Sequence, residues 1–267
     1  MKKFNNMKIT LFTADQPRHN YLITLLAKIS KKLYVIQEKK VTFSSAFPNN
    51  LKKPFAMATY FKKVQQAENK LFLKKKIIKN KKIKIHKVKI EDNINKIEIK
   101  KNSTFFNSNI YIVFGSSYLK GHLVDFLIKN RAINIHLGIS PYYRGTDCNF
   151  WALYDNNPHL VGATIHLLSK GLDNGPILYH AMSKPDKSSF NYTMTSAMAA
   201  FYSLVEKIKD KTIFTCKTYK QKKIKEIRYT KKKDFNEEVV IKFLKKKINL
   251  NSKKINKKMY KNLFLLK

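Results

Sequence analysis

Short apolar runs alternate along this chain with segments in which apolar residues recur at helical spacing. Strands are predicted for the short runs, at residues 8–13, 33–37, 110–115 and 132–137. Apolar residues three or four positions apart form one face of a helix, and such helices are predicted at 21–29, 56–72, 120–129 and 190–208. Strands that alternate with helices form parallel sheets. We therefore expect an α/β protein with a Rossmann-like, mostly parallel sheet and helices on both faces.

Two lysine-rich segments have a different pattern. In Ile77–Ile99, isoleucine and valine alternate with lysine, which predicts an edge or half-exposed strand. The end of the chain is also rich in lysine, with a helix predicted at Glu237–Ile248 and a helical end at Met259–Leu266. We predict a catalytic domain over residues 1–214 and a short, partly helical, lysine-rich extension over residues 215–267.

Polar residues interrupt the strand predicted at 132–137. Asn134 and His136 lie two positions apart, so their side chains point to the same face of a sheet. Further along, Gly171 and Gly175 bracket Asp173 in a turn. An amide, an imidazole and a carboxylate at strand ends can carry out acid–base chemistry and stabilise an oxyanion. On spacing alone, a packed core histidine with an unrelated loop aspartate is the simpler interpretation.

Four segments together change that balance. In order and spacing they resemble the formyltransferases that use 10-formyltetrahydrofolate, a family that includes the methionyl-tRNA, glycinamide ribonucleotide and sugar N-formyltransferases. The segments are Asn134–His136, Ser140–Gly145, Gly162–His166 and Gly171–Leu178. The resemblance is close over residues 110–182 and weaker from Met7 to about Phe235. It implies direct transfer of a formyl group from the folate N10 to a primary amine, with no covalent enzyme intermediate.

The resemblance implies that Asn134, His136 and Asp173 are the catalytic residues. The amine attacks the formyl carbon, and the formyl oxygen becomes an oxyanion that Asn134 and His136 can stabilise by donating hydrogen bonds. Asp173 can hold His136 in its charged form or correct tautomer and relay protons from the attacking amine.

The co-substrate implied by the resemblance is 10-formyltetrahydrofolate. Its slot would have the loop after the strand at 110–115 as a wall, with cofactor contacts from Gly115, Ser117, Tyr118 and Leu119. Gly115 would let the backbone pass close to the ligand, and a plain strand-to-helix loop is the alternative. The turn after the first strand, at 13–20, lacks a Gly-x-Gly-x-x-Gly sequence. A dinucleotide bound in the Rossmann manner is therefore not expected.

Three further residues are candidate substrate contacts, each with an alternative. Arg18 lies at a predicted helix N-terminus, where an anion can bind, or it belongs to an ordinary solvated turn. Arg144 either positions an acidic substrate group or pins its own loop to a nearby carboxylate. His166 either faces the cleft or is a packed core histidine.

Departures from the family narrow the expected substrate. Glycinamide ribonucleotide formyltransferases carry a glycine- and serine-rich phosphate loop at the first turn, which is absent here. Methionyl-tRNA formyltransferases carry a C-terminal barrel-like domain, for which the extension at 215–267 is too short. A small amine, such as an amino sugar or a nucleotide-linked amine, is favoured by elimination. Enzymes like the methionyl-tRNA or glycinamide ribonucleotide formyltransferases stay as alternatives.

The formal charge of +38 comes from 55 lysines and arginines against 17 acidic residues. Such a balance is typical of nucleic-acid binders, and a non-catalytic nucleic-acid-binding protein on this fold is a second alternative. Only four of the basic residues are arginine, the side chain best suited to bidentate contacts with phosphates and bases. From Asn134 to Ala181 the only lysine or arginine residues are Arg144 and Lys170. A lysine-rich solvated surface is therefore the favoured interpretation.

The patterns of cysteine, histidine and hydropathy exclude disulfide-rich, zinc-binding and membrane-spanning classes of protein. Cys148 and Cys216 do not make a disulfide framework or a zinc cluster, and the seven histidines lack metal-ligand spacing. We expect no metal. No apolar stretch approaches the roughly 18–20 residues of a membrane span. The N-terminus is basic, but Ile9–Ala14 is too short for the apolar region of a signal sequence. A cytoplasmic location without a membrane partner is expected, and the oligomeric state is left open.

Overall fold

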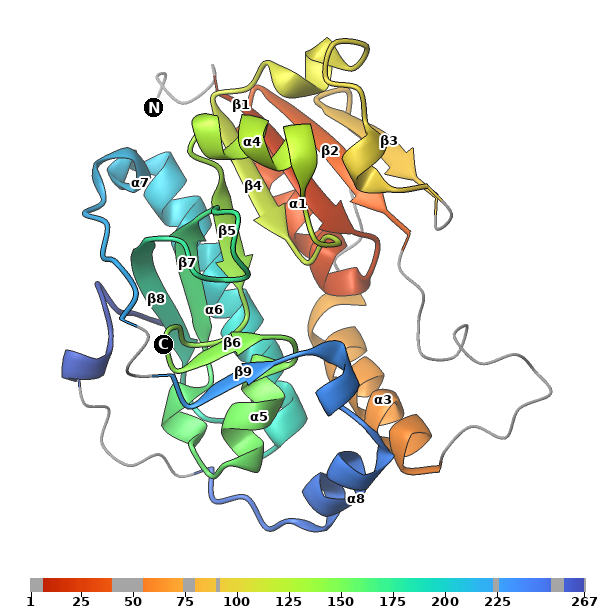
Figure 1. Ribbon diagram of the computed structural model, residues 1–267, viewed down its shortest axis with the longest axis vertical. Coiled ribbons are helices and arrows are strands. Elements are labelled where there is room, and N and C mark those ends of the chain that lie inside the picture. The colour runs from red at the N-terminus through yellow and green to blue at the C-terminus, as the bar shows by residue number, and fades with distance from the viewer. Residues whose placement is uncertain are drawn as a thin grey trace.

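The computed structural model describes residues 7–39, 55–73, 80–89, 92–222, 226–250 and 257–266 (Figure 1). Within them, an eight-stranded sheet has the order β10-β8-β7-β5-β4-β1-β2-β3. Its strands are β1 (Lys8–Ala14), β2 (Lys32–Glu38), β3 (Ile83–Val88), β4 (Ile110–Phe114), β5 (Ile133–His136), β7 (Ala163–Leu167), β8 (Ile177–Ser183) and β10 (Phe264–Leu266). Neighbouring strands are parallel, except that β7 is antiparallel to β5 and β8. The predicted α/β fold with a mostly parallel sheet is confirmed.

Helices cover both faces of the sheet because its strands are apolar on both sides. α1 (Pro17–Ile29) and α6 (Ser189–Lys209) pack on one face, and α4 (Gly121–Lys129) packs on the other. The alternation along β1 shows the division. Leu11 belongs to the cluster under α1 and α6, whereas the next residue, Phe12, belongs to the cluster under α4. Both side chains are fully buried.

A third cluster of aromatic side chains joins three helices below the sheet in Figure 1. These are α3 (Phe55–Glu68), α5 (Cys148–Tyr154) and α8 (Glu237–Lys245). The ring of Phe150 in α5 lies 4.5 Å from that of Phe243 in α8 and 5.6 Å from that of Tyr60 in α3. Such contacts contribute stability beyond the burial of area alone. The aromatic residues of α3 and α8 therefore stabilise α5.

The C-terminal residues contact the rest of the protein at several points. The short helix α7 (Thr212–Thr215) follows α6 in the chain. Further along, β9 (Arg228–Thr230) pairs in parallel with β6 (Tyr143–Gly145). The carboxylate of Glu237 accepts hydrogen bonds from the first backbone N–H groups of α3, at Ala56 and Met57, over 2.8 and 3.1 Å. The division of the chain near residue 214 stays a prediction.

Two sequence-based elements differ from the structure. The predicted helical end at Met259–Leu266 is wrong, because Lys257–Met259 forms a single 3-10 turn and Phe264–Leu266 forms β10. Pairing with β8 covers backbone groups that would otherwise form an open sheet edge. The lysine-laced strand predicted at 77–99 is limited to β3. Residues 77–79 and 90–91 of that prediction lie outside the described residues.

In the part of the chain that the structure describes, no helix combines the length and apolar composition needed to cross a membrane.

Phe201 on α6 provides a test of the packing between α6 and the sheet. Its side chain is fully buried, and its ring lies 5.0 Å from that of Phe114 on β4. We expect Phe201→Ala to lower the free energy of unfolding by about 3–5 kcal/mol, because it leaves a cavity in the core. Urea denaturation measures this loss. Phe214→Ala is the matched control, since Phe214 is 54% exposed and its loss should cost less than about 0.5 kcal/mol. Equal losses in the two variants would contradict this packing.

Candidate active site

Side chains along β5 point alternately to the hydrophobic core and to the candidate site. Ile133 and Ile135 point into the cluster under α1 and α6. Asn134 and His136 therefore point to the opposite face, as predicted from their spacing. On the neighbouring strand β7, His166 is the register partner of Asn134. The sheet thus places three polar side chains side by side on one face.

Asp173 reaches the same place from the turn between β7 and β8. Its backbone has a φ of +48°, which is uncommon for a residue other than glycine. Carboxylate oxygen Oδ2 lies 3.3 Å from His136 Nδ1 and accepts a hydrogen bond from the backbone N–H of Gly145 over 3.3 Å. The other oxygen, Oδ1, accepts a hydrogen bond from Asn134 Nδ2 over 3.3 Å. The structure therefore brings Asn134, His136 and Asp173 into direct contact.

Both ring nitrogens of His136 face acceptors. Nδ1 faces Asp173, and Nε2 lies 3.2 Å from the carbonyl oxygen of Tyr143. Burial lowers the pKa of His136, and the nearby Asp173 carboxylate opposes this effect by raising it. A neutral His136 with its proton on Nδ1 donates to Asp173, and a second proton on Nε2 would find an acceptor in Tyr143. The ring is placed to gain and lose a proton.

Asp173 stays ionised in this setting. Burial raises the pKa of its carboxyl group, but the groups around it, among them His136 and the Gly145 N–H, favour the charged form and bring the pKa to about 2. An ionised carboxylate at 9% side-chain exposure can stabilise a positive charge on His136 more strongly than it would in water.

His166 orients Asn134. Its Nδ1 lies 2.8 Å from the carbonyl oxygen of Leu167, which identifies Nδ1 as the protonated nitrogen. Its Nε2 then accepts a hydrogen bond from Asn134 Nδ2 over 3.0 Å. The side chain of His166 is 1% exposed. Both ring nitrogens of His166 thus form hydrogen bonds within the protein. A contact of His166 with substrate stays a prediction.

A second, partly buried network holds the loop that faces His136. Tyr143 supplies the carbonyl oxygen near His136, and its hydroxyl donates to Asp155 over 3.1 Å. Arg228 on β9 makes two hydrogen bonds to Asp155, over 2.6 and 2.7 Å, and stacks 4.6 Å from the centre of the Trp151 ring. The sequence analysis missed this anchor. The sequence contains one hint of it, because arginine and acidic residues are both rare in this lysine-rich chain.

Gly138 is a further position that the sequence analysis missed. A Cβ atom there would lie 2.6 Å from His136 Nε2 and 2.5 Å from the Cβ of Cys148. Any larger residue would displace the imidazole, so the position of His136 requires glycine. Cys148 is 2% exposed, and burial raises the pKa of its thiol well above the usual value. It packs as a neutral side chain.

The predicted cofactor loop lies where the strand order reverses, between β1 and β4. In open α/β sheets, ligands bind in the crevice beyond the strand ends at such a point. The first turn of α1 meets the end of β4 there through His19, whose ring centre lies 4.5 Å from that of Phe114. Gly115 has a φ of +61°, and a Cβ on it would lie 2.6 Å from His19 Cε1. Gly115 thus permits a close approach of α1 to the loop after β4.

The other three predicted cofactor residues differ in exposure. The backbone N–H of Ser117 donates to Glu38 over 2.6 Å. Tyr118 is 56% exposed, and its hydroxyl donates to the carbonyl oxygen of Lys170, near the Asp173 turn, over 2.6 Å. Leu119 is 6% exposed and packs in the cluster under α4. The ring of Tyr118 is therefore exposed near the Asp173 turn, whereas the buried Leu119 packs the loop after β4 against the cluster under α4.

Arg18 and Arg144 both form ion pairs within the protein. Arg18 pairs with the buried Glu68 over 2.9 Å. Arg144 pairs with Glu226 over 2.8 Å, donates to the carbonyl oxygen of Leu172 over 2.9 Å, and stacks over Tyr229. The contacts of Arg144 are those of the loop-pinning alternative. Its contact with substrate, and that of Arg18, stay predictions.

Within the described ranges, no group of three or more His, Cys, Asp or Glu side chains could hold a metal ion. Metal-free chemistry stays a prediction.

Three solved structures share this fold at low sequence identity. A sugar N-formyltransferase from Shewanella sp FDAARGOS_354 has a TM-score of 0.50 and 16% identity, over 86% of this chain and 78% of that one. Glycinamide ribonucleotide transformylase 1 from Symbiobacterium toebii has a TM-score of 0.52 and 12% identity, over 81% and 95%. The N-formyltransferase from Helicobacter canadensis, in complex with folinic acid and dTDP-3-aminofucose, has a TM-score of 0.50 and 13% identity, over 92% and 76%.

The likeness to these structures shows that they share an α/β fold with this chain. A family model described as formyl transferase matches residues 57–203, more than half of the chain. The protein belongs to the formyl transferase family, and the predicted resemblance is confirmed.

The contact between His136 and Asp173 can be tested by titration. The carboxylate raises the pKa of His136 against the effect of burial, so we expect Asp173→Asn to lower that pKa below its wild-type value. NMR of the imidazole resonances measures the change. Asp125→Asn is the control, because Asp125 is exposed and pairs with Lys170. A His136 pKa that Asp173→Asn leaves unchanged or raises would show that the two side chains do not interact as described.

Proposed function

We propose that this enzyme transfers a formyl group from 10-formyltetrahydrofolate to the primary amine of a small molecule, with a nucleotide-linked amino sugar as the favoured acceptor. The observation that carries the proposal is the contact of Asn134, His136 and Asp173 on one face of the sheet. Membership of the formyl transferase family supports the reaction type.

The proposed chemistry follows from the protonation states of this cluster. The amine nitrogen attacks the formyl carbon, and a new C–N bond forms as the bond from that carbon to N10 breaks. A proton from the amine passes to the His136–Asp173 pair and then to N10, which leaves a formamide and tetrahydrofolate. Asp173, ionised with a pKa of about 2, favours the charged form of His136 while the proton is held there.

The negative charge that develops on the formyl oxygen needs hydrogen-bond donors. Asn134 Nδ2 donates to His166 over 3.0 Å and to Asp173 over 3.3 Å. The longer bond is the weaker one, so in our proposal the oxyanion replaces Asp173 as the acceptor of that proton. His166 meanwhile keeps the amide plane fixed through the shorter bond. In our proposal charged His136 supplies a second donor, because its Nε2 proton, which faces the Tyr143 carbonyl oxygen, is shared with the oxyanion.

In our proposal folate binds beyond the carboxyl ends of β1 and β4, where the strand order reverses. The exposed ring of Tyr118 offers a flat surface beside the Asp173 turn, and Gly115 lets the backbone of the loop after β4 lie close to His19. A mostly apolar slot with a few backbone donors suits a pterin ring. The Helicobacter canadensis neighbour, which binds folinic acid, adds support for folate as the formyl donor.

The acceptor class rests on the neighbours and on the first turn. The Helicobacter canadensis structure contains dTDP-3-aminofucose, and the Shewanella neighbour is named a sugar N-formyltransferase. The turn after β1 carries Arg18, which pairs with Glu68, in place of a glycine- and serine-rich phosphate loop. This difference favours an amino sugar over glycinamide ribonucleotide.

The catalytic assignment predicts the effect of three substitutions. We expect Asn134→Ala, His136→Ala and Asp173→Ala each to lower the rate of tetrahydrofolate release by about 10²–10³, because each removes a donor or its partner. Spectrophotometric assays with a panel of nucleotide-linked and free amino sugars measure the rates. The double variant Asn134→Ala/Asp173→Ala should lose little more than either single variant, since the residues act together. Asp125→Ala is the control. Two of the three variants with rates within about threefold of wild type would refute the assignment.

The folate slot predicts a difference between two glycine substitutions. Gly115 and Gly121 have nearly equal φ values of +61° and +62°, so alanine brings similar backbone strain at both. Only at Gly115 does the new Cβ meet a side chain, that of His19 at 2.6 Å, whereas nothing lies within 4 Å at Gly121. We expect Gly115→Ala to weaken folinic acid binding about tenfold or more in calorimetry, and Gly121→Ala to have little effect. Wild-type protein that binds a nicotinamide dinucleotide but not folinic acid would overturn the cofactor assignment.

A further inference from the structure

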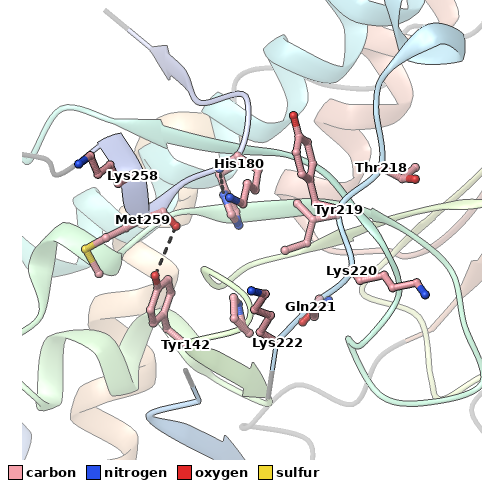
Figure 2. A pocket seen from close by; sticks show the side chains of 12 residues that line it. Tyr142, His180, Thr218, Tyr219, Lys220, Gln221, Lys222, Lys258 and Met259 are labelled. Carbon is pink, nitrogen blue, oxygen red and sulfur yellow. Dashed lines mark hydrogen bonds between the residues drawn. The ribbon is translucent and has the colours of Figure 1, made fainter. Parts of the chain in front are cut away.

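A cavity of about 390 Å³ lies beside the candidate active site, between the loop after β5, strand β8 and the C-terminal residues. Figure 2 shows its lining. Tyr142 extends from the loop after β5, Tyr219 and Gln221 come from the segment after α7, and Met259 comes from the segment before β10. The volume is in the range of small-molecule sites.

The charge of the lining has one sign. Lys220, Lys222, Lys258 and Lys261 line the cavity, and no aspartate or glutamate does. In Figure 2, Lys222 is drawn between Tyr142 and Gln221, whereas Lys220 extends away from them. Lys261 lies over the ring of Tyr219 at 5.4 Å. Among the described residues, neither Lys222 nor Lys261 forms an ion pair. An anion that enters the cavity would therefore meet lysine charges without competing carboxylates.

Gln221 adds a second polar feature. Its Nε2 donates to the carbonyl oxygens of Asp173 and Gly175, each over 2.8 Å, which fixes the amide orientation. Gln221 thus joins the cavity wall to the turn that carries Asp173.

The wall formed by β8 is neutral and fixed. His180 Nε2 lies 2.9 Å from the carbonyl oxygen of Ser140, and its Nδ1 accepts a hydrogen bond from the backbone N–H of Lys261 over 2.9 Å. Burial lowers the pKa of His180 to about 4, so the ring is uncharged near neutral pH. It joins the loop after β5 to the C-terminal segment and keeps the cavity wall in place.

We propose that this cavity binds a phosphate ester, such as a nucleotide or a sugar phosphate. The lysines supply point charges for the phosphate, and Tyr142 and Tyr219 provide aromatic walls. The phosphate belongs either to the amine substrate itself or to a separate ligand. In both cases Gln221, which lines the cavity, joins its wall to the backbone of Asp173.

Calorimetry with uridine diphosphate and with inorganic pyrophosphate tests the proposal directly, without amine or folate. Its result is therefore independent of whether the enzyme transfers formyl groups. We expect both anions to bind wild-type protein, and the double variant Lys222→Ala/Lys261→Ala to bind them about tenfold or more weakly. Lys28→Ala/Lys129→Ala is the matched control, because it removes the same charge from exposed positions on α1 and α4 and should retain wild-type affinity.

A third titration distinguishes the two sources of the phosphate. Displacement of uridine diphosphate by a uridine diphosphate-linked amino sugar assigns the cavity to the amine substrate, and simultaneous binding of both assigns it to a separate ligand. Either result supports the proposal. Absence of binding to wild-type protein, or equal affinity in the wild type and the cavity variant, would overturn it. Tighter binding of pentaglutamate than of uridine diphosphate would also overturn it, because the cavity would then select carboxylates.

Discussion

The site depends on one buried charge, the carboxylate of Asp173. Water is largely excluded from it, so its interactions with His136, Asn134 and the Gly145 N–H act at a low effective dielectric constant. Asn134 and His136 lie on β5, and Gly145 lies at the end of β6. The carboxylate therefore determines both the protonation of the imidazole and the relative position of strand β5 and the loop after it.

That loop is held from its other side by residues far along the chain. Arg228 stabilises Asp155, Asp155 accepts from the Tyr143 hydroxyl, and the Tyr143 carbonyl oxygen faces His136. A guanidinium that makes two hydrogen bonds to a carboxylate has a fixed geometry. Arg228 thus contributes to the site without touching His136, and a change at Arg228 would reach the imidazole through two intervening groups.

Local patterns in the sequence were enough for strands β1, β2, β4 and β5, the main helices and the facing of Asn134 and His136, because alternation and helical spacing are short-range properties. Partners separated by many residues were beyond such patterns. The pairing of β10 with β8 and the Arg228–Asp155 ion pair depend on tertiary contacts. The need for Gly138 likewise follows from the position of a neighbouring ring, and no turn signal in the sequence indicates it.

The two edges of the sheet are protected in different ways. At one edge β10 lies beside β8, and at the other β3 carries the exposed lysines Lys84 and Lys87 between its apolar residues. An uncovered edge strand offers unpaired backbone groups to a second copy of the chain. Lysines on both copies repel each other at that edge, and salt weakens the repulsion. Part of the lysine excess therefore acts as a barrier to aggregation, and colloidal stability of the protein becomes a function of ionic strength.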